Sequence, residues 1–339
     1  MGPVKKKVCR LDKLKNLKIL REILGVSAAE WQILTQRGDS NFRTREIPKD
    51  DGTMRELEIP KDRLKRIHSR IHHQLSLLPT PDYLHSGVKG RSSLTNGRAH
   101  EDAKSALTLD IKKFYPSCSA SAVFEFFRYR LQQPRDIAEG LVSVVTYGGH
   151  IPTGSPLSQG LAYWSKAPAF DEIYRYAVNR GLKMSLYVDD ITLSSTTPKI
   201  PGHTFTDVAG ILKRYQLRAK QNKTHFYGAQ ASKRITGNIL QPDGTIVAPN
   251  KLREKLFREF IAPVGGDVSR LPESKARSAL GVLRTIRTVE RKPTYPGLYC
   301  KLVNHERLCA ELAAANSLAA SLGRQSSAVG LPIDREAGF

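Results

Sequence analysis

The 339-residue sequence predicts an α+β fold, in which short antiparallel strands and amphipathic helices share one core. Residues 184–188 and 191–194 alternate apolar and polar side chains on either side of an acidic turn, which is typical of a hairpin of half-buried strands. Residues 106–111 form a third short, mostly apolar strand. From about residue 250 the apolar residues recur at helical spacing.

The remaining elements follow in chain order. Residues 1–40 are expected to form two helices, the second opened by a capping box at residues 27–30. Four leucines approximate the apolar stripe of the first helix: Leu11, Leu14, Leu17 and Leu24. Residues 41–105 combine short strands with a helix around residues 64–75, and residues 106–240 alternate strands and helices.

The acidic turn carries the sequence Tyr187-Val188-Asp189-Asp190. Hairpins usually turn on Asn-Gly or Asp-Gly, so Asp-Asp is a poor choice for the turn alone. The two carboxylates also repel each other unless a cation lies between them. An ordinary acidic loop is the alternative, since the same dipeptide occurs at residues 50–51.

A second carboxylate lies in the strand at residues 106–111. If this strand lies beside the hairpin, Asp110 and Asp189 converge, with Asp190 flanking them. Three hard oxygen donors suit Mg²⁺ better than a softer metal. Two such ions about 3.5–4 Å apart would stabilise both the attacking and the leaving oxygen of a phosphoryl transfer. The alternative is that Asp110 is a strand-end residue bonded to a neighbouring amide.

At these residues the chain resembles a reverse transcriptase. Residues 109–115 (LDIKKFY) resemble the first palm motif of that family, and residues 187–190 (YVDD) resemble its catalytic hairpin. Between them, residues 151–159 (IPTGSPLSQ) are similar to the Pro-x-Gly loop that contacts template and nucleotide. Residues 46–55 followed by Pro60 resemble the fingers hairpin, and residues 222–224 (NKT) resemble the lysine motif.

The resemblance implies a right-hand polymerase fold with five parts. These are N-terminal helices (1–40), fingers (41–105), a palm with an antiparallel sheet (106–240), a helical thumb that binds RNA (241–325) and a loose tail (326–339). In this fold Asp110, Asp189 and Asp190 would be catalytic. Together with the backbone carbonyl of Ile111 they would hold two Mg²⁺ ions.

Two short segments resemble signatures of bacterial retron reverse transcriptases. Residues 96–100 (NGRAH) resemble Asn-Ala-x-x-His, with Gly97 where alanine is usual, and residues 235–237 (ITG) resemble Val-Thr-Gly. The resemblance implies copying of a cognate structured noncoding RNA into a branched RNA–DNA product, and a role in phage defence with an effector protein. No ribonuclease H site is recognised, so template removal would fall to a host ribonuclease H.

Five residues are predicted to contact the incoming deoxynucleotide: Lys49, Arg55, Tyr115, Gly154 and Lys223. Basic side chains on the fingers hairpin could grip a triphosphate, and Lys223 could lie near the leaving pyrophosphate. Tyr115 could exclude a 2′-hydroxyl, and Gly154 could let the backbone approach a ligand. The alternatives are a solvated basic hairpin, a surface lysine, a core aromatic residue and an ordinary turn.

The charge of the chain favours a polyanionic partner. There are 54 Lys+Arg against 32 Asp+Glu, a formal net charge of +22. Eight residues are predicted to bind RNA: Asn96, His100, Thr236, Gly237, Arg253, Arg258, Arg284 and Arg287. A helical bundle with solvated basic faces is the alternative for the arginines.

The sequence also limits location and class. No segment approaches the roughly 20 apolar residues of a membrane span, and the N-terminus lacks the apolar core of a signal peptide. The four cysteines show neither metal spacing nor a disulfide framework, so a cytoplasmic protein without a membrane partner is expected. Three other functions are considered: a different bacterial reverse transcriptase, an RNA-templated RNA polymerase and a noncatalytic RNA-binding scaffold.

Overall fold

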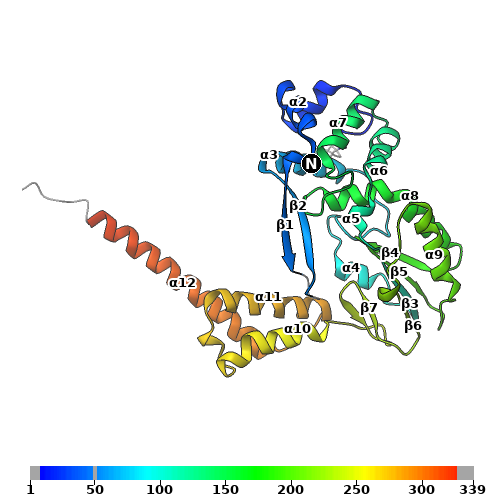
Figure 1. Ribbon diagram of the computed structural model, residues 1–339. Helices are drawn as coiled ribbons and strands as arrows, with labels where there is room; N and C mark the ends of the chain where they lie inside the picture. Colours follow the sequence, from blue (N-terminus) through cyan, green and yellow to red (C-terminus); the bar gives the residue numbers. More distant parts are fainter. Residues whose placement is uncertain (1–7, 49–51, 327–339) are drawn as a thin grey trace, which may run out of the picture. The chain divides into compact units, whose positions relative to one another are not determined.

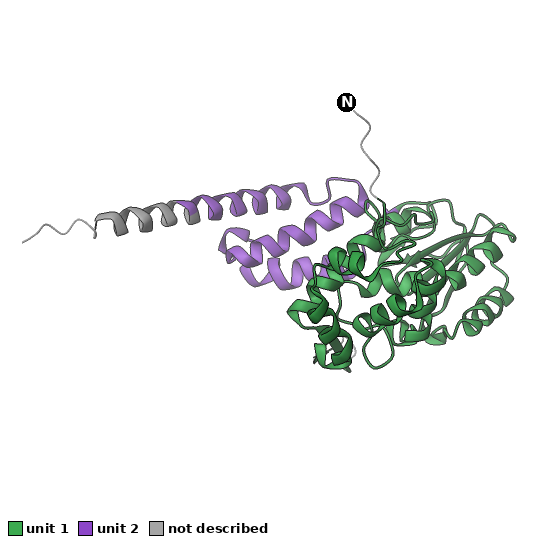
Figure 2. Cartoon of the chain, turned by 90° about the horizontal axis from the view of Figure 1, so that it is seen from above, with its two compact units in different colours: residues 1–245 green, residues 246–339 purple. Residues whose placement is uncertain are grey.

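The computed structural model describes residues 8–48 and 52–326, and it divides the chain into two compact units. Unit 1 comprises residues 1–245 and unit 2 residues 246–339 (Figure 2). The predicted tail lies outside the described residues, apart from Ser326. The names fingers, palm and thumb stay predictions.

Unit 1 is a mixture of helices and antiparallel strands (Figure 1). Its α-helices are α1 (Leu17–Leu24), α2 (Ala28–Arg37), α3 (Asp62–Leu75), α4 (Ser93–Arg98), α5 (Phe114–Ser117), α6 (Ala120–Glu125), α7 (Arg135–Val145), α8 (Ser158–Val178) and α9 (His203–Arg214). Three short segments have other helical geometry: the 3₁₀ turns η1 (Gly38–Asn41) and η3 (Gln221–Lys223), and the π-helical turn η2 (Phe126–Arg130). The predicted α+β class is confirmed.

The start of the chain departs from prediction in two details. Helix α1 begins only at Leu17, because the Asn16 side chain accepts a hydrogen bond from the Lys18 N–H and caps it. Leu11 and Leu14 therefore precede the helix, although both are buried. The Ser27 hydroxyl caps α2 as predicted, but the Glu30 carboxylate pairs with Arg63 of α3 and does not complete the capping box.

The central sheet has four antiparallel strands in the order β4-β5-β3-β6. These are β4 (Lys183–Tyr187), β5 (Asp190–Ser195), β3 (Ser105–Asp110) and β6 (His225–Tyr227). The prediction of half-buried strands was wrong for the hairpin, since Ser185, Thr192 and Ser194 are as buried as their apolar neighbours. A buried histidine, His100, bonds Ser185 and Ser194, which satisfies polar groups that water would otherwise solvate.

Two further hairpins complete unit 1. β1 (Phe42–Pro48) pairs with β2 (Met54–Pro60), and β7 (Lys233–Ile235) pairs with β8 (Asn238–Leu240). A single apolar cluster joins the helices to the sheet, and helix α8 contributes Phe170 to it. Leu109, Ile111 and Ile191 belong to this cluster, so the strand ends that carry Asp110 and Asp190 are packed against the core.

Unit 2 is almost entirely helical. It contains β9 (Ile246–Val247), α10 (Asn250–Lys255), the π-helical segment η4 (Leu256–Ile261), the 3₁₀ turns η5 (Ala262–Val264) and η6 (Val268–Arg270), α11 (Glu273–Glu290) and α12 (Pro296–Ser326). Leu280, Leu283 and Ile286 form the buried face of α11. Within the described part of the chain, no helix combines the length and apolarity needed to cross a membrane.

Candidate active site

The three predicted catalytic aspartates lie together at one end of the central sheet. Asp110 ends β3 and lies opposite Asp190, the first residue of β5. The Ile111 N–H donates a hydrogen bond to the Asp189 carbonyl (2.9 Å), which ties the turn between β4 and β5 to the end of β3. The predicted role of the Ile111 carbonyl as a metal ligand stays a prediction.

The turn that carries Asp189 has a strained backbone. Val188 has φ +59°, a conformation that is a genuine outlier for a β-branched residue. Its N–H donates to the hydroxyl of Ser86 (2.9 Å), which is itself buried. A strained backbone of this kind persists only where the surrounding contacts hold it in place, and such residues cluster at functional sites.

Burial and mutual repulsion disfavour the charged forms of two of the three carboxyl groups. Burial raises the pKa of Asp189, and the nearby Asp110 charge raises it further. Burial, followed by the charges of Asp189 and Asp110, raises the pKa of Asp190 to about 6. Lys220 and Lys223 oppose these shifts, and both pair with the Asp110 carboxylate (3.4 Å for Lys223 Nζ).

The donor chemistry of the site suits a hard divalent cation, since all three side chains offer carboxylate oxygens. Among the described residues, however, no group of three or more His, Cys, Asp or Glu side chains surrounds a common point. Asp110 is held instead by Lys220, a residue that the sequence analysis missed. The sequence feature that could have identified Lys220 is its position three residues before Lys223, in the same basic segment.

A cleft of about 360 Å³ opens beside the aspartates. Asp110, Asp190 and Lys223 line it together with the turn Thr236–Gly237 between β7 and β8. Arg234, which no sequence pattern singled out, lies in the same wall and is exposed. The structure thus brings the second signature segment to the predicted catalytic residues.

The first signature segment lies in the interior. Asn96 and His100 have no exposed surface, so the prediction that they contact RNA was wrong. Both His100 nitrogens are used by serine hydroxyls, at 2.6 Å from Ser194 and 2.7 Å from Ser185. The Asn96 amide donates to the Thr236 hydroxyl (2.5 Å), so this residue supports the turn at the cleft from behind.

The predicted nucleotide residues lie on both sides of the aspartates. Tyr115 is half-buried in α5, and burial together with the Asp189 charge raises its pKa to about 12, while Arg55 acts in the opposite direction. Arg55, exposed on β2, and Asp189 therefore both lie within electrostatic reach of this ring. Lys223 contacts Asp110, and Lys49 lies outside the described residues.

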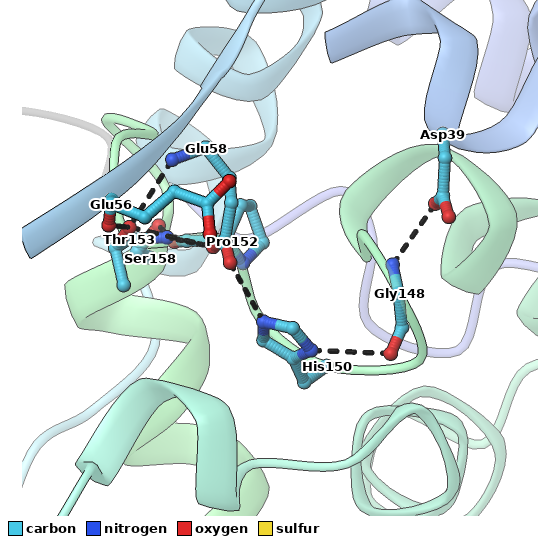
Figure 3. Close-up of polar contacts among 8 residues, drawn as sticks. All are labelled: Asp39, Glu56, Glu58, Gly148, His150, Pro152, Thr153 and Ser158. Atoms are coloured by element: carbon cyan, nitrogen blue, oxygen red, sulfur yellow. Dashed lines mark hydrogen bonds and ion pairs between the residues drawn. The ribbon is translucent and has the colours of Figure 1, made fainter. Parts of the chain in front are cut away.

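The Pro-x-Gly loop packs directly against β2 (Figure 3). A Cβ added to Gly154 would lie 2.8 Å from the Glu58 carbonyl oxygen, so only glycine fits this approach. The Gly154 N–H donates to that same carbonyl (3.0 Å). The structure therefore gives Gly154 a packing role, whether or not it also contacts a nucleotide.

The four predicted RNA-binding arginines of unit 2 differ in their surroundings. Arg258 is exposed, and Arg284 is exposed while pairing with Glu306 (3.3 Å). Arg287 lies over the Tyr299 ring, 3.8 Å from its centroid. Arg253 pairs with the buried Glu290, and this ion pair competes with the predicted contact to RNA.

Comparison with known proteins identifies the family. The family described as Reverse transcriptase (RNA-dependent DNA polymerase) matches residues 47–240, which include the three aspartates and both signature segments. The chain belongs to the reverse transcriptase family. The predicted right-hand polymerase fold is thereby confirmed, and reverse transcriptases generally use divalent metal ions.

Curated relatives of this reverse transcriptase are retron enzymes, which confirms the predicted resemblance. It is 27% identical to the retron Se72 reverse transcriptase of Salmonella heidelberg over 54% of this chain and 50% of that enzyme. It is 26% identical to the retron Ec86 reverse transcriptase of Escherichia coli, over 72% and 77% of the two chains. The matched region thus spans half the length of the Se72 enzyme.

A solved structure of telomerase from Candida albicans, in complex with a fragment of telomeric RNA, is also similar. Its TM-score is 0.45 at 12% sequence identity, and the match covers 78% of this chain and 59% of that one.

Proposed function

We propose that this chain is an RNA-directed DNA polymerase of the retron type, which copies a cognate structured noncoding RNA into DNA. The observation that carries the proposal is the register of the central sheet. It sets Asp110 opposite Asp190 and ties Asp189 to the end of β3, within a chain of the reverse transcriptase family.

In the proposed reaction Asp110 and Asp189, assisted by Asp190, would hold two Mg²⁺ ions. When bound, the ions would activate the primer hydroxyl and stabilise the leaving pyrophosphate. The raised pKa values of Asp189 and Asp190 support a cation site, because a bound cation would favour their charged forms. Lys220 would neutralise Asp110 while no cation is bound and would have to release it for metal ligation.

The remaining residues would bind and orient the substrates. Arg55 would contact the triphosphate, and the Tyr115 ring would exclude a 2′-hydroxyl from the sugar position. Lys223, already beside Asp110, would lie near the pyrophosphate. The exposed Arg258 and Arg284 would contact the RNA backbone, where each phosphate contact adds to the salt dependence of binding.

The further retron properties are proposed from the relatives. The product would be a branched RNA–DNA primed from a 2′-hydroxyl of the RNA, and a host ribonuclease H would remove the template. An effector protein would act with the enzyme in phage defence.

The test is to express the gene with several hundred bases of native flanking DNA, beside an Asp189→Asn variant. We expect a short, abundant DNA species with the active protein alone, shifted in mobility by debranching enzyme. The variant should lose at least about 10³-fold of the DNA, because it removes a charged metal ligand, and should keep its RNA affinity. Equal DNA yield from the variant would contradict the site assignment.

A second assay separates the polymerase from the retron. If no such DNA appears, the purified protein is given a primed generic RNA template. DNA synthesis there would keep the polymerase and reject the retron role, whereas no synthesis in either assay would favour the noncatalytic scaffold.

A further inference from the structure

A buried carboxylate joins the β1–β2 hairpin to the Pro-x-Gly loop. Glu58 of β2 is only 8% exposed and has no Lys or Arg partner among the described residues. One carboxylate oxygen accepts the Thr153 N–H (2.8 Å), and the other lies 3.0 Å from His150 Nε2 (Figure 3). A buried charge is tolerated only when it is hydrogen-bonded, so these contacts account for its presence.

The backbone and the hydroxyl of Thr153 strengthen the same connection. The Thr153 hydroxyl donates to the Glu56 carbonyl (3.1 Å) and accepts from the Glu58 N–H (3.3 Å). The Gly154 N–H donates to the Glu58 carbonyl (3.0 Å). The loop is therefore bonded to β2 by both main chain and side chain, at a strand pair far away in sequence.

His150 connects this cluster to a rigid turn. Residues 147 and 150 exchange two backbone hydrogen bonds around Gly148 and Gly149, both of which have positive φ. His150 Nδ1 lies 3.2 Å from the Gly148 carbonyl, while Nε2 faces the Glu58 carboxylate. Both partners are acceptors, so both contacts are made only by a ring that carries a proton on each nitrogen.

The strand that Glu58 holds also carries a predicted substrate residue. Arg55 is three residues before Glu58 on β2, and its charge, like that of Asp189, acts on the Tyr115 hydroxyl. A shift of β2 against the loop would therefore move Arg55 relative to the aspartates. Displacements of about 1 Å at a reacting site can cost about 10²-fold in rate.

We infer that Glu58 is a positioning residue, which locks the β1–β2 hairpin to the Pro-x-Gly loop so that Arg55 and Gly154 meet the incoming nucleotide as one unit. The inference rests on the proposed polymerase function. It assigns Glu58 no contact with substrate and no part in the chemistry.

The test compares two substitutions of Glu58. Glu58→Ala removes both acceptors and leaves the Thr153 N–H and His150 Nε2 without these partners. Glu58→Gln keeps an oxygen for the Thr153 N–H, and its amide group can donate to Nε2 of a neutral His150. Glu172→Ala is the matched control, because it removes an ion pair with Arg214 and a bond from Tyr215 (3.0 Å) elsewhere in unit 1.

On a primed RNA template, we expect Glu58→Ala to raise the KM for deoxynucleotide about tenfold, the size of effect that the loss of hydrogen bonds to a charged group produces. The kcat should fall less, and Glu58→Gln should restore KM to within about threefold of the wild type. Hydrogen exchange of peptides covering residues 150–156 should accelerate in Glu58→Ala alone. Glu172→Ala should change neither readout.

The exchange measurement needs no activity, so it separates this inference from the proposed function. Unchanged exchange in Glu58→Ala would overturn the lock between loop and hairpin. Faster exchange with an unchanged KM would overturn its effect on the nucleotide. A wild-type protein that makes no DNA would overturn the proposed function, and with it the kinetic half of this inference, while the exchange result would still decide whether the lock exists.

Discussion

Two hairpin tips of unit 1 hold similar backbone strain in different ways. The tip between β4 and β5 consists of Val188 and Asp189, and the tip between β7 and β8 consists of Thr236 and Gly237. Each begins with a β-branched residue at positive φ, +59° for Val188 and +46° for Thr236. Only the second tip continues with a glycine at positive φ (+80°), the residue that such a turn favours.

Each tip forms a hydrogen bond with a buried residue from the segment that precedes β3. The Ser86 hydroxyl accepts the Val188 N–H, whereas the Asn96 amide donates to the Thr236 hydroxyl. The first bond holds the backbone and the second holds a side chain. The tip that carries Asp189 lacks the glycine that such a turn favours. Its backbone strain costs about 1–3 kcal/mol, which the surrounding contacts offset.

The largest expected effect concerns His100, which joins the strands behind the first tip. Burial lowers its pKa to about 3, against about 6.5 in an unfolded chain. Below pH 6.5 the unfolded state therefore binds a proton that the folded state excludes, so stability falls as the pH decreases toward 3. Between pH 7 and pH 4 this residue should remove on the order of 3 kcal/mol of unfolding free energy.

Urea unfolding of unit 1, followed by tryptophan fluorescence at several pH values, measures this loss. His100→Gln is the comparison, because glutamine can bond both serines and does not titrate. Subtracting its profile from that of the wild type removes all other titrating groups, including the buried His68, whose pKa is lowered to about 4. Parallel profiles would show that folding does not lower the pKa of His100.

Sequence patterns predicted the part of the site that depends on local spacing. The alternation on either side of residues 187–190 predicted the hairpin, and the resemblance to reverse transcriptases implied that Asp110 would lie beside it. The resemblance to known signatures identified Asn96 and Thr236, and the hydrogen bond between them joins the two signature segments. The same signature could not distinguish a residue that binds RNA from one that is buried.

Contacts between distant segments that no motif marks could not be predicted. Neither Lys220 beside Asp110 nor Glu58 beside Thr153 belongs to a periodic pattern, because each pair is joined only by the folded topology. Arg253 was expected to be free for RNA, yet it pairs with Glu290, which lies 37 residues away. Charge counts show that a chain is basic but not which cations are already paired.

The second prediction concerns a substitution that removes the backbone strain of the β4–β5 tip. Val188→Gly removes the cost of the positive φ, about 1–2 kcal/mol. It also removes the packing of a half-buried side chain and raises the conformational entropy of the unfolded chain, and both changes lower the unfolding free energy. These terms oppose each other, so the unfolding free energy should change by less than about 1 kcal/mol. The kcat should fall about tenfold, since Asp189 is held less rigidly.

Val188→Ala separates the two causes, because it removes most of the packing and keeps the backbone restraint of a Cβ. Primer-extension kinetics and urea midpoints are measured for both variants. If Val188→Ala loses as much kcat as Val188→Gly, side-chain packing and not backbone strain positions the carboxylates.

The smallest expected effect tests the second tip. Gly237→Ala places a Cβ where no other atom lies within 4 Å, so any cost comes from the positive φ alone and should be about 1 kcal/mol of unfolding free energy. Gly210→Ala is the matched control, since it also meets open space but lies inside helix α9, where alanine should stabilise by about 0.5–1 kcal/mol. Urea midpoints should therefore move in opposite directions. A shift in the same direction would mean that the β7–β8 turn relaxes freely, and that the two tips differ in rigidity as well as in sequence.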